Sequence, residues 1–189
     1  GAATYFYVQS AVGPMRVVSA DGMAVRPFTL NRLLMGMGET YDVIVTLPAA
    51  GRYEVRATAQ DGSGHASIWL GEGEAHHAPD IPKPKIYGMD WMLGGIGPVE
   101  PSGVEPARPQ APYPHLRSTT STRPPVDAPV REMELRLTGN MERYTWSFNG
   151  KTLAEDSIIP VKRGEVLRIR FINDTMMHHP LHLHGHFFR

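Results

Sequence analysis

The stretch RYEVRATA, residues 52–59, alternates apolar and polar side chains with a period of two. Successive side chains of an extended chain point to opposite faces, so this alternation predicts a half-buried β-strand. The residues on its apolar face are Tyr53, Val55, Ala57 and Ala59. The stretch YDVIVTL, residues 41–47, predicts a second such strand, with an apolar face made of Tyr41, Val43, Val45 and Leu47.

Turn-forming residues separate these strand candidates from their neighbours. Asp21 and Gly22 follow MRVVSA at 15–20, and QDGSG at 60–64 follows the strand described first. Short strands divided by Gly, Pro and Asp turns at this spacing are typical of a β-sandwich or barrel. The first 75 residues are therefore predicted to belong to an all-β domain.

The composition limits the class of protein. The chain has 189 residues, 41% of them hydrophobic, which is enough for a packed core. Lys plus Arg (19) balance Asp plus Glu (19), so no broad positive field is available for nucleic acid. No apolar run approaches the length of a membrane span. The chain has no cysteine, which excludes disulfides and Cys-based zinc sites within it.

A proline-rich stretch divides the sequence. Twelve of the 17 prolines fall between Pro79 and Pro129. Proline lacks the backbone N–H that a central strand needs for its ladder. Residues 76–130 are therefore predicted to form an extended connection between domains, in which residues 79–129 contribute no central strand.

Strand signals resume after this connection. REMELRLTG at 131–139 and EVLRIRFIND at 165–174 both alternate apolar residues with charged ones. The predicted turns between them are NGK at 149–151 and KRGE at 162–165. Trp146 and Phe148 alternate on a further strand candidate and are predicted to be core residues.

Each β-rich part is shorter than a complete sandwich. Residues 131–189 hold roughly half the strands of a sandwich of about 100 residues, and the N-terminal part opens directly in strand-like sequence. We therefore expect two partial domains. Residues 1–75 are interpreted as the C-terminal part of one domain, and residues 131–189 as the N-terminal part of the next.

The stretch HHPLHLHGH, residues 178–186, holds five of the nine histidines. Imidazole is the commonest neutral metal ligand, so this cluster predicts a metal site. On an extended chain His182 and His184 point to the same face, roughly 6.6 Å apart along the strand. His179 is an odd number of residues away and faces the other side, unless Pro180 bends the path, so one segment could supply two metal centres.

Other interpretations fit these histidines less well. Surface histidines that only satisfy polar groups are common singly but rare as H-P-x-H-x-H. A metallo-β-lactamase-like hydrolase needs an Asp soon after the H-x-H pair, where Gly185, His186 and Phe187 stand. An amidohydrolase needs strands that alternate with helices, which this pattern does not predict.

The sequence HHPLHLHGHFF resembles the third copper-binding motif of the multicopper oxidases. LTGNMERYTWSFNGK and FINDTMMHHPLHLHG resemble the bacterial copper-resistance and laccase-like branch of that family. MRVVSADGMAVRP and GETYDVIVTLP resemble the closing strands of its second cupredoxin domain. The resemblance implies an all-β fold with cupredoxin-like Greek-key β-sandwich domains, present here as two partial domains joined by the proline-rich connection.

The resemblance also implies a role for three histidines, with copper as the cofactor. His179 corresponds to a ligand of type 1 copper, His182 to a ligand of type 2 copper and His184 to a ligand of the type 3 pair. His178 and His186 match no ligand position. Gly185 is interpreted either as a site of close backbone packing or as a plain turn.

Two early H-x-H motifs and a final His-Cys-His motif of the family are absent from this chain. We therefore expect a part of a multicopper oxidase that oxidises phenolic substrates or Cu(I) in one-electron steps and reduces dioxygen to water. Its partners would include the remaining segments of the same protein, and the resemblance implies a periplasmic or secreted location. Alone the chain is predicted to be inactive. The alternative is a non-catalytic copper-binding or assembly module.

Two further groups have simpler interpretations. Methionine pairs such as Met35 and Met37 could ligate Cu(I), but methionines more often fill cores. The polar residues at the start of the connection are interpreted as a solvated loop rather than a metal site. They are Glu72, Glu74, His76 and His77.

Overall fold

The computed structural model describes residues 5–48, 50–60, 62–81, 111–140, 142–156, 158–175, 179–186 and 188. The chain divides into two compact units, Gly1–Ser121 together with Pro180–Arg189, and Thr122–His179. Apart from one 3₁₀ turn, η1 (Tyr113–His115), the regular elements of the described residues are β-strands. The all-β prediction is therefore confirmed.

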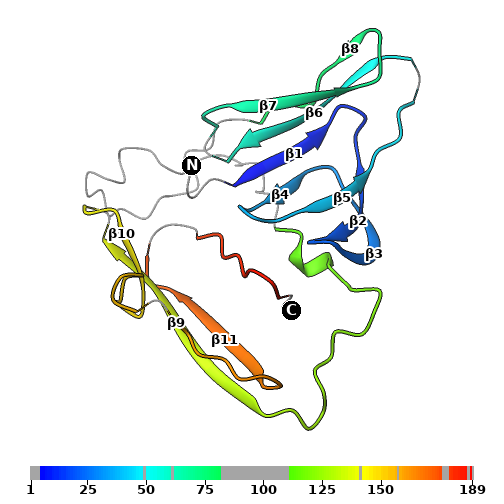
Figure 1. Cartoon of the computed structure of the whole chain (residues 1–189). Coiled ribbons are helices and arrows are strands. Elements are labelled where there is room, and N and C mark those ends of the chain that lie inside the picture. Colours follow the sequence, from blue (N-terminus) through cyan, green and yellow to red (C-terminus); the bar gives the residue numbers. More distant parts are fainter. Residues whose placement is uncertain are drawn as a thin grey trace, which may run out of the picture. The chain divides into compact units, whose positions relative to one another are not determined.

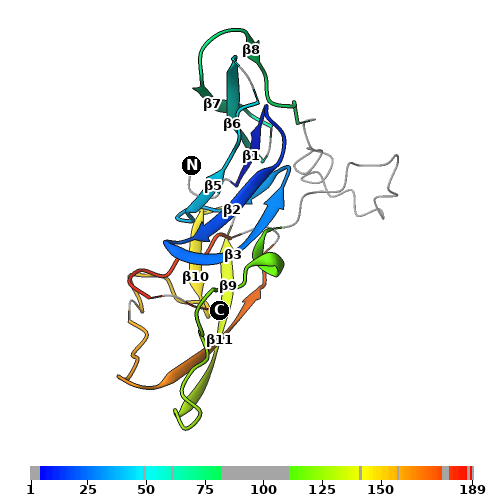
Figure 2. The same ribbon diagram turned by 90° about the vertical axis from the view of Figure 1, so that its right-hand side faces the viewer.

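The first unit holds two sheets. Its strands are β1 (Phe6–Ser10), β2 (Met15–Ala20), β3 (Met23–Leu30), β4 (Leu33–Met35), β5 (Tyr41–Ile44), β6 (Arg52–Ala59), β7 (His65–Leu70) and β8 (Ala75–His76). One sheet has the order β4-β1-β6-β7, with β8 parallel to β6, and the other has the order β3-β2-β5. The chain passes back and forth between the sheets (Figures 1 and 2), as expected of a cupredoxin-like Greek-key β-sandwich.

The core of this unit takes side chains from both sheets. Met15 and Val17 of β2 are fully buried, and Leu33 of β4 and Tyr53 of β6 are nearly so. The predicted turn after MRVVSA is a two-residue β-hairpin loop. Asp21 and Gly22 both have positive φ, 48° and 74°, as a type I′ turn requires.

Strand β6 differs from its predicted burial. The apolar face is covered as expected, with Tyr53 and Ala59 buried. The polar face is covered too, since Glu54, Arg56 and Thr58 are 2%, 7% and 9% exposed. The prediction of a half-buried strand was therefore wrong. The cover on the polar face includes Ser67 of β7 and the chain just after β8, because both donate hydrogen bonds to Glu54.

The second unit contains a three-stranded sheet, β10-β9-β11, built from β9 (Val130–Asn140), β10 (Thr145–Phe148) and β11 (Val166–Asn173). Strand β10 is antiparallel to β9 and β11 is parallel to it. Leu135 and Leu137 are buried while Glu132 and Glu134 are exposed, so the predicted alternation of β9 is confirmed.

The prediction that Trp146 and Phe148 are core residues was wrong. Their side chains are 39% and 43% exposed. The indole of Trp146 lies over Gly139, its partner on β9, where an added β-carbon would stand 2.4 Å from the ring. The missing side chain at position 139 therefore makes room for the indole on the surface of the sheet rather than in a core.

Of the proline-rich connection at 76–130 the structure describes 76–81 and 111–130, while 82–110 lie outside the described residues. Its first and last residues, His76 and Val130, belong to β8 and β9; between them the described part contains η1 and an isolated bridge from Ser118 to Val25 of β3, but no named strand. His115 at the end of η1 stacks on Phe28, with ring centroids 5.5 Å apart. The domain limits at residues 75 and 130 stay a prediction.

Candidate metal centre

The histidine segment contains the candidate ligands His182 and His184. Their rings are in edge-on contact, with centroids 4.7 Å apart and planes at 83°. Both residues are exposed, and 179–186 is not a strand. The strand geometry predicted for this segment is therefore wrong, whereas the predicted placement of His182 and His184 together agrees with the ring contact.

A glycine-containing loop between β4 and β5 packs against this segment. A β-carbon at Gly38 would lie 2.7 Å from both Cγ and Nδ1 of His182. A β-carbon at Gly36 would lie 3.4 Å from Cβ of Pro180. The His182 ring thus rests directly on the backbone at position 38, where only glycine leaves enough room.

The carboxylate of Glu39 fixes the shape of that loop. Its Oε2 accepts the backbone N–H of Gly36 at 2.8 Å, and its Oε1 accepts the hydroxyl of Tyr113 in η1. Burial, followed by the charge of Glu39, raises the pKa of Tyr41 above its usual range. The phenol of Tyr41 therefore stays neutral beside the carboxylate.

His179 has a different set of neighbours. Its Nε2 lies 2.6 Å from the hydroxyl of Thr175, and its ring meets Trp146 edge-on with centroids 5.1 Å apart. The residue is half-buried. Sequence reasoning proposed His179 as a ligand but missed Thr175 and Trp146, since no pattern linked either to a histidine.

The remaining residues of the histidine cluster add no further support for a metal site. His178 lies outside the described residues, and His186 is exposed. Gly185 has φ of 77° and no atom within 4 Å of a β-carbon built on it, which favours the plain turn over close packing. Within the described part of the chain, no three His, Asp or Glu side chains converge as a metal site.

The polar residues at the start of the connection do not form a metal site within the described ranges. His76 stacks on Tyr53 with centroids 4.6 Å apart. His77 places Nδ1 3.3 Å from Oε2 of the buried Glu54. These two histidines pack against β6 instead of facing only solvent.

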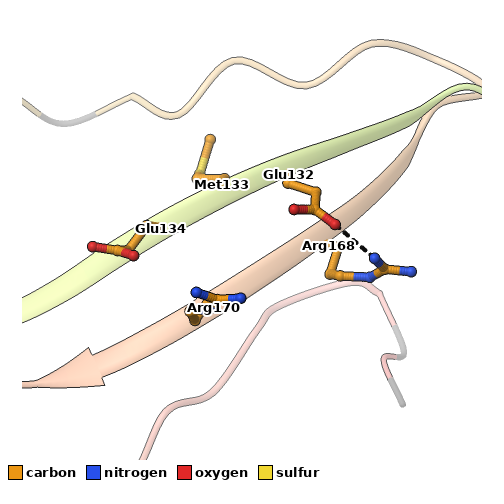
Figure 3. Close-up of a pocket in the computed structure, with 5 residues that line it drawn as sticks. All are labelled: Glu132, Met133, Glu134, Arg168 and Arg170. Carbon is orange, nitrogen blue, oxygen red and sulfur yellow. Dashed lines mark hydrogen bonds and ion pairs between the residues drawn. The ribbon is translucent and has the colours of Figure 1, made fainter.

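A pocket of about 250 Å³ lies over β9 and β11 (Figure 3). Arg168 donates to Glu132 across the parallel pair at 2.6 Å, and Glu134 and Arg170 are the next pair in the same register. The fifth lining residue is Met133. The pocket contains none of the candidate copper ligands, so it is a charged surface of the sheet rather than part of the metal centre.

Comparison with known proteins agrees with the motif. Residues 7–75 and 127–189 each match the family described as multicopper oxidase, and together these ranges cover most of the chain. The chain belongs to the multicopper oxidase family. Members of this family bind copper, and type 1, type 2 and type 3 centres are typical of the complete enzymes.

Several named proteins are similar to this multicopper oxidase chain. Copper resistance protein A of Escherichia coli is 29% identical, over 97% of this chain and 44% of that protein. Multicopper oxidase MmcO of Mycobacterium tuberculosis (strain ATCC 25618 / H37Rv) is 29% identical, over 98% of this chain and 33% of that protein. The crystal structure of a laccase from Botrytis aclada aligns with 79% of this chain and 26% of that chain, at 17% identity and a TM-score of 0.42. The chain thus spans less than half the length of these proteins.

The donor set fits copper in part. Imidazole is a ligand that Cu(II) favours, and His182 and His184 present two of them side by side on an exposed segment. Two imidazoles are fewer than a closed copper centre needs.

No helix in the described ranges is long and apolar enough to cross a membrane.

Proposed function

We propose that this chain is part of a copper oxidase that removes single electrons from a phenolic substrate or from Cu(I) and reduces dioxygen to water. The observation that carries the proposal is the H-P-x-H-x-H segment. It lies inside the range that matches the family, and the rings of His182 and His184 are in contact. Surface histidines without a function are rarely grouped in this pattern.

Each of the three histidines has a distinct part in this proposal. His179 would hold type 1 copper, His182 type 2 copper and His184 one ion of the type 3 pair. Bound copper supplies the one-electron chemistry. The protein supplies position, since Gly38 supports the ring of His182 and Thr175 engages the ring of His179.

The remaining ligands would come from other segments of the same protein. The chain has no cysteine to serve as a type 1 thiolate ligand. The residue limits of the two partial cupredoxin domains, and a periplasmic or secreted location, belong to the same proposal. They rest on the family resemblance.

A second candidate is a copper-binding or assembly module without turnover. Exposed imidazoles at 182 and 184 could hold copper without transferring electrons. The two candidates differ in the complete protein. An oxidase consumes dioxygen with a phenolic donor or Cu(I), whereas a module retains copper and consumes none.

Copper retention tests the ligand assignment. The chain and its H182A/H184A variant are loaded with Cu(II), dialysed and analysed for bound metal. The pair is expected to account for most of the retained copper, so the double variant should lose it. H65A/H186A removes the same number of histidines outside the assigned set and should retain copper. Equal retention by both double variants would refute the assignment of His182 and His184.

A further inference from the structure

Hydrogen bonds link Asn173 and Thr175 to His179, the first histidine of the H-P-x-H-x-H segment. The backbone N–H and the hydroxyl of Thr175 both donate to Oδ1 of Asn173, at 3.0 and 2.8 Å. The same hydroxyl oxygen lies 2.6 Å from Nε2 of His179. The side chain of Thr175 thus stands between an amide oxygen and an imidazole nitrogen.

The protons of this chain can be counted. A threonine hydroxyl has one proton to donate, and a carbonyl oxygen only accepts. Because Thr175 donates its proton to Asn173, the hydroxyl oxygen must accept at its contact with His179. Nε2 of His179 is therefore the protonated nitrogen. A neutral imidazole with a proton on Nε2 carries its lone pair on Nδ1.

We propose that Asn173 and Thr175 form a positioning relay that holds His179 as the Nε2–H tautomer and so presents Nδ1 to a metal. The part that concerns the metal rests on the proposed function, in which His179 is a copper ligand. The tautomer itself is a property of the metal-free chain. Hydrogen bonds of this kind fix both the tautomer and the ring orientation of metal-binding histidines elsewhere.

The indole of Trp146 supports the same ring from another element. Its contact with His179 is edge-on, with planes at 70°. Asp174 is the one residue between the end of β11 and Thr175. Its backbone N–H donates to the carbonyl of Leu137 on β9 at 3.0 Å. Contacts with Leu137 of β9 and Trp146 of β10 therefore fix the positions of Thr175 and His179.

The test is the ring nitrogen spectrum of the full 189-residue chain, labelled with ¹⁵N and free of metal, at alkaline pH where imidazoles are neutral. The variants are T175V, which keeps the shape of the side chain but has no hydroxyl, and T175S, which keeps the hydroxyl. We expect His179 to be the Nε2–H tautomer in wild type and T175S. In T175V the population of the Nδ1–H form should rise about fivefold to tenfold, the size expected for one lost hydrogen bond.

The outcomes separate the relay from a merely structural role. If His179 is the Nδ1–H tautomer in the wild-type chain, the relay proposal is refuted. This result does not depend on whether any variant folds. An unchanged tautomer population in a folded T175V also overturns it. Addition of Cu(II) then tests the proposed function independently. If His179 is the Nε2–H tautomer but Cu(II) does not broaden its ring signals, the relay proposal stands. The same result would count against a type 1 role for His179.

Discussion

The carboxylate of Glu54 and the guanidinium of Arg56 form a buried ion pair on one face of β6, two residues apart. Two hydrogen bonds join them, Nε to Oε1 at 2.9 Å and Nη2 to Oε2 at 2.8 Å, and the side chains are only 3% and 9% exposed. Ser67 and the backbone N–H of Ala78 also donate to the carboxylate, and Arg56 donates to Asp80. The pair therefore fastens the chain that leaves β8 to the centre of the sheet.

This pair predicts a loss of stability in acid. The hydrogen bonds from Arg56, above all, lower the pKa of Glu54 from 4.5 to about 2. The carboxylate thus stabilises the fold above pH 4.5, and its contribution is lost as the pH falls from 4.5 towards 2. Urea unfolding should show a larger decline over this window in wild type than in E54Q. E72Q, an exposed control with the same change of charge, should keep the wild-type decline; an identical decline in E54Q would contradict the prediction.

A second prediction concerns the two partners separately. R56M leaves a buried carboxylate without its main partner and should lower the free energy of unfolding by about 3–5 kcal/mol. E54M/R56M removes both charges and should cost less than R56M alone, because no buried charge is left unpaired. Denaturant unfolding of the two variants decides the order. If the double variant is less stable than R56M, the loss of stability comes from the loss of the pair and not from the unpaired carboxylate.

Alternation in the sequence predicted where the strands lie but not what covers them. RYEVRATA is a strand, as its period of two indicates, and its apolar face is buried at Tyr53 and Ala59 and partly buried between them. The same pattern placed Glu54 and Arg56 in solvent, because alternation describes one strand and contains nothing about a second layer. The cover comes from Ser67 and from the chain at 78, and only the pairing of β6 with β7 and β8 brings these residues there.

The candidate site shows the same division. Histidine spacing predicted that His182 and His184 lie together, because two side chains two residues apart tend to share a side of an extended segment. Gly38 lies 144 positions before His182 in the sequence, and a glycine gives no sign of the ring that rests on it. Trp146 was predicted as core from its strand position, and its exposure beside His179 reflects how few layers cover this sheet.

The contact between Gly38 and His182 gives a third prediction. In G38A the new methyl group would fall 2.7 Å from the imidazole, so the ring must move. We expect the ring signals of His182 to shift and retained Cu(II) to fall several-fold. Nuclear magnetic resonance of the imidazoles and metal analysis after dialysis measure the two effects.

The matched control for this variant is G22A. Gly22 has φ of 74°, close to the 79° of Gly38, but no atom lies within 4 Å of a β-carbon built on it. Both substitutions introduce the same backbone strain, of about 1 kcal/mol. Only G38A should affect His182. Equal changes at His182 in both variants would attribute the effect to strain and not to the contact.

The last prediction concerns the copper-loaded chain by itself. Without cysteine no copper-thiolate bond can form, so the chain should lack the intense visible absorption of a blue type 1 centre. Its described residues bring together only His182 and His184, and no group of three His, Asp or Glu ligands converges among them. Copper should therefore be held in a partial histidine site, and oxygen uptake with a phenolic donor should not be sustained. An absorption spectrum and an oxygen electrode test both statements on one sample. A strong thiolate band or continued four-electron reduction of dioxygen would disprove the proposal that further segments complete the centres, whereas recovery of both on addition of a segment that carries a His-Cys-His motif would support it.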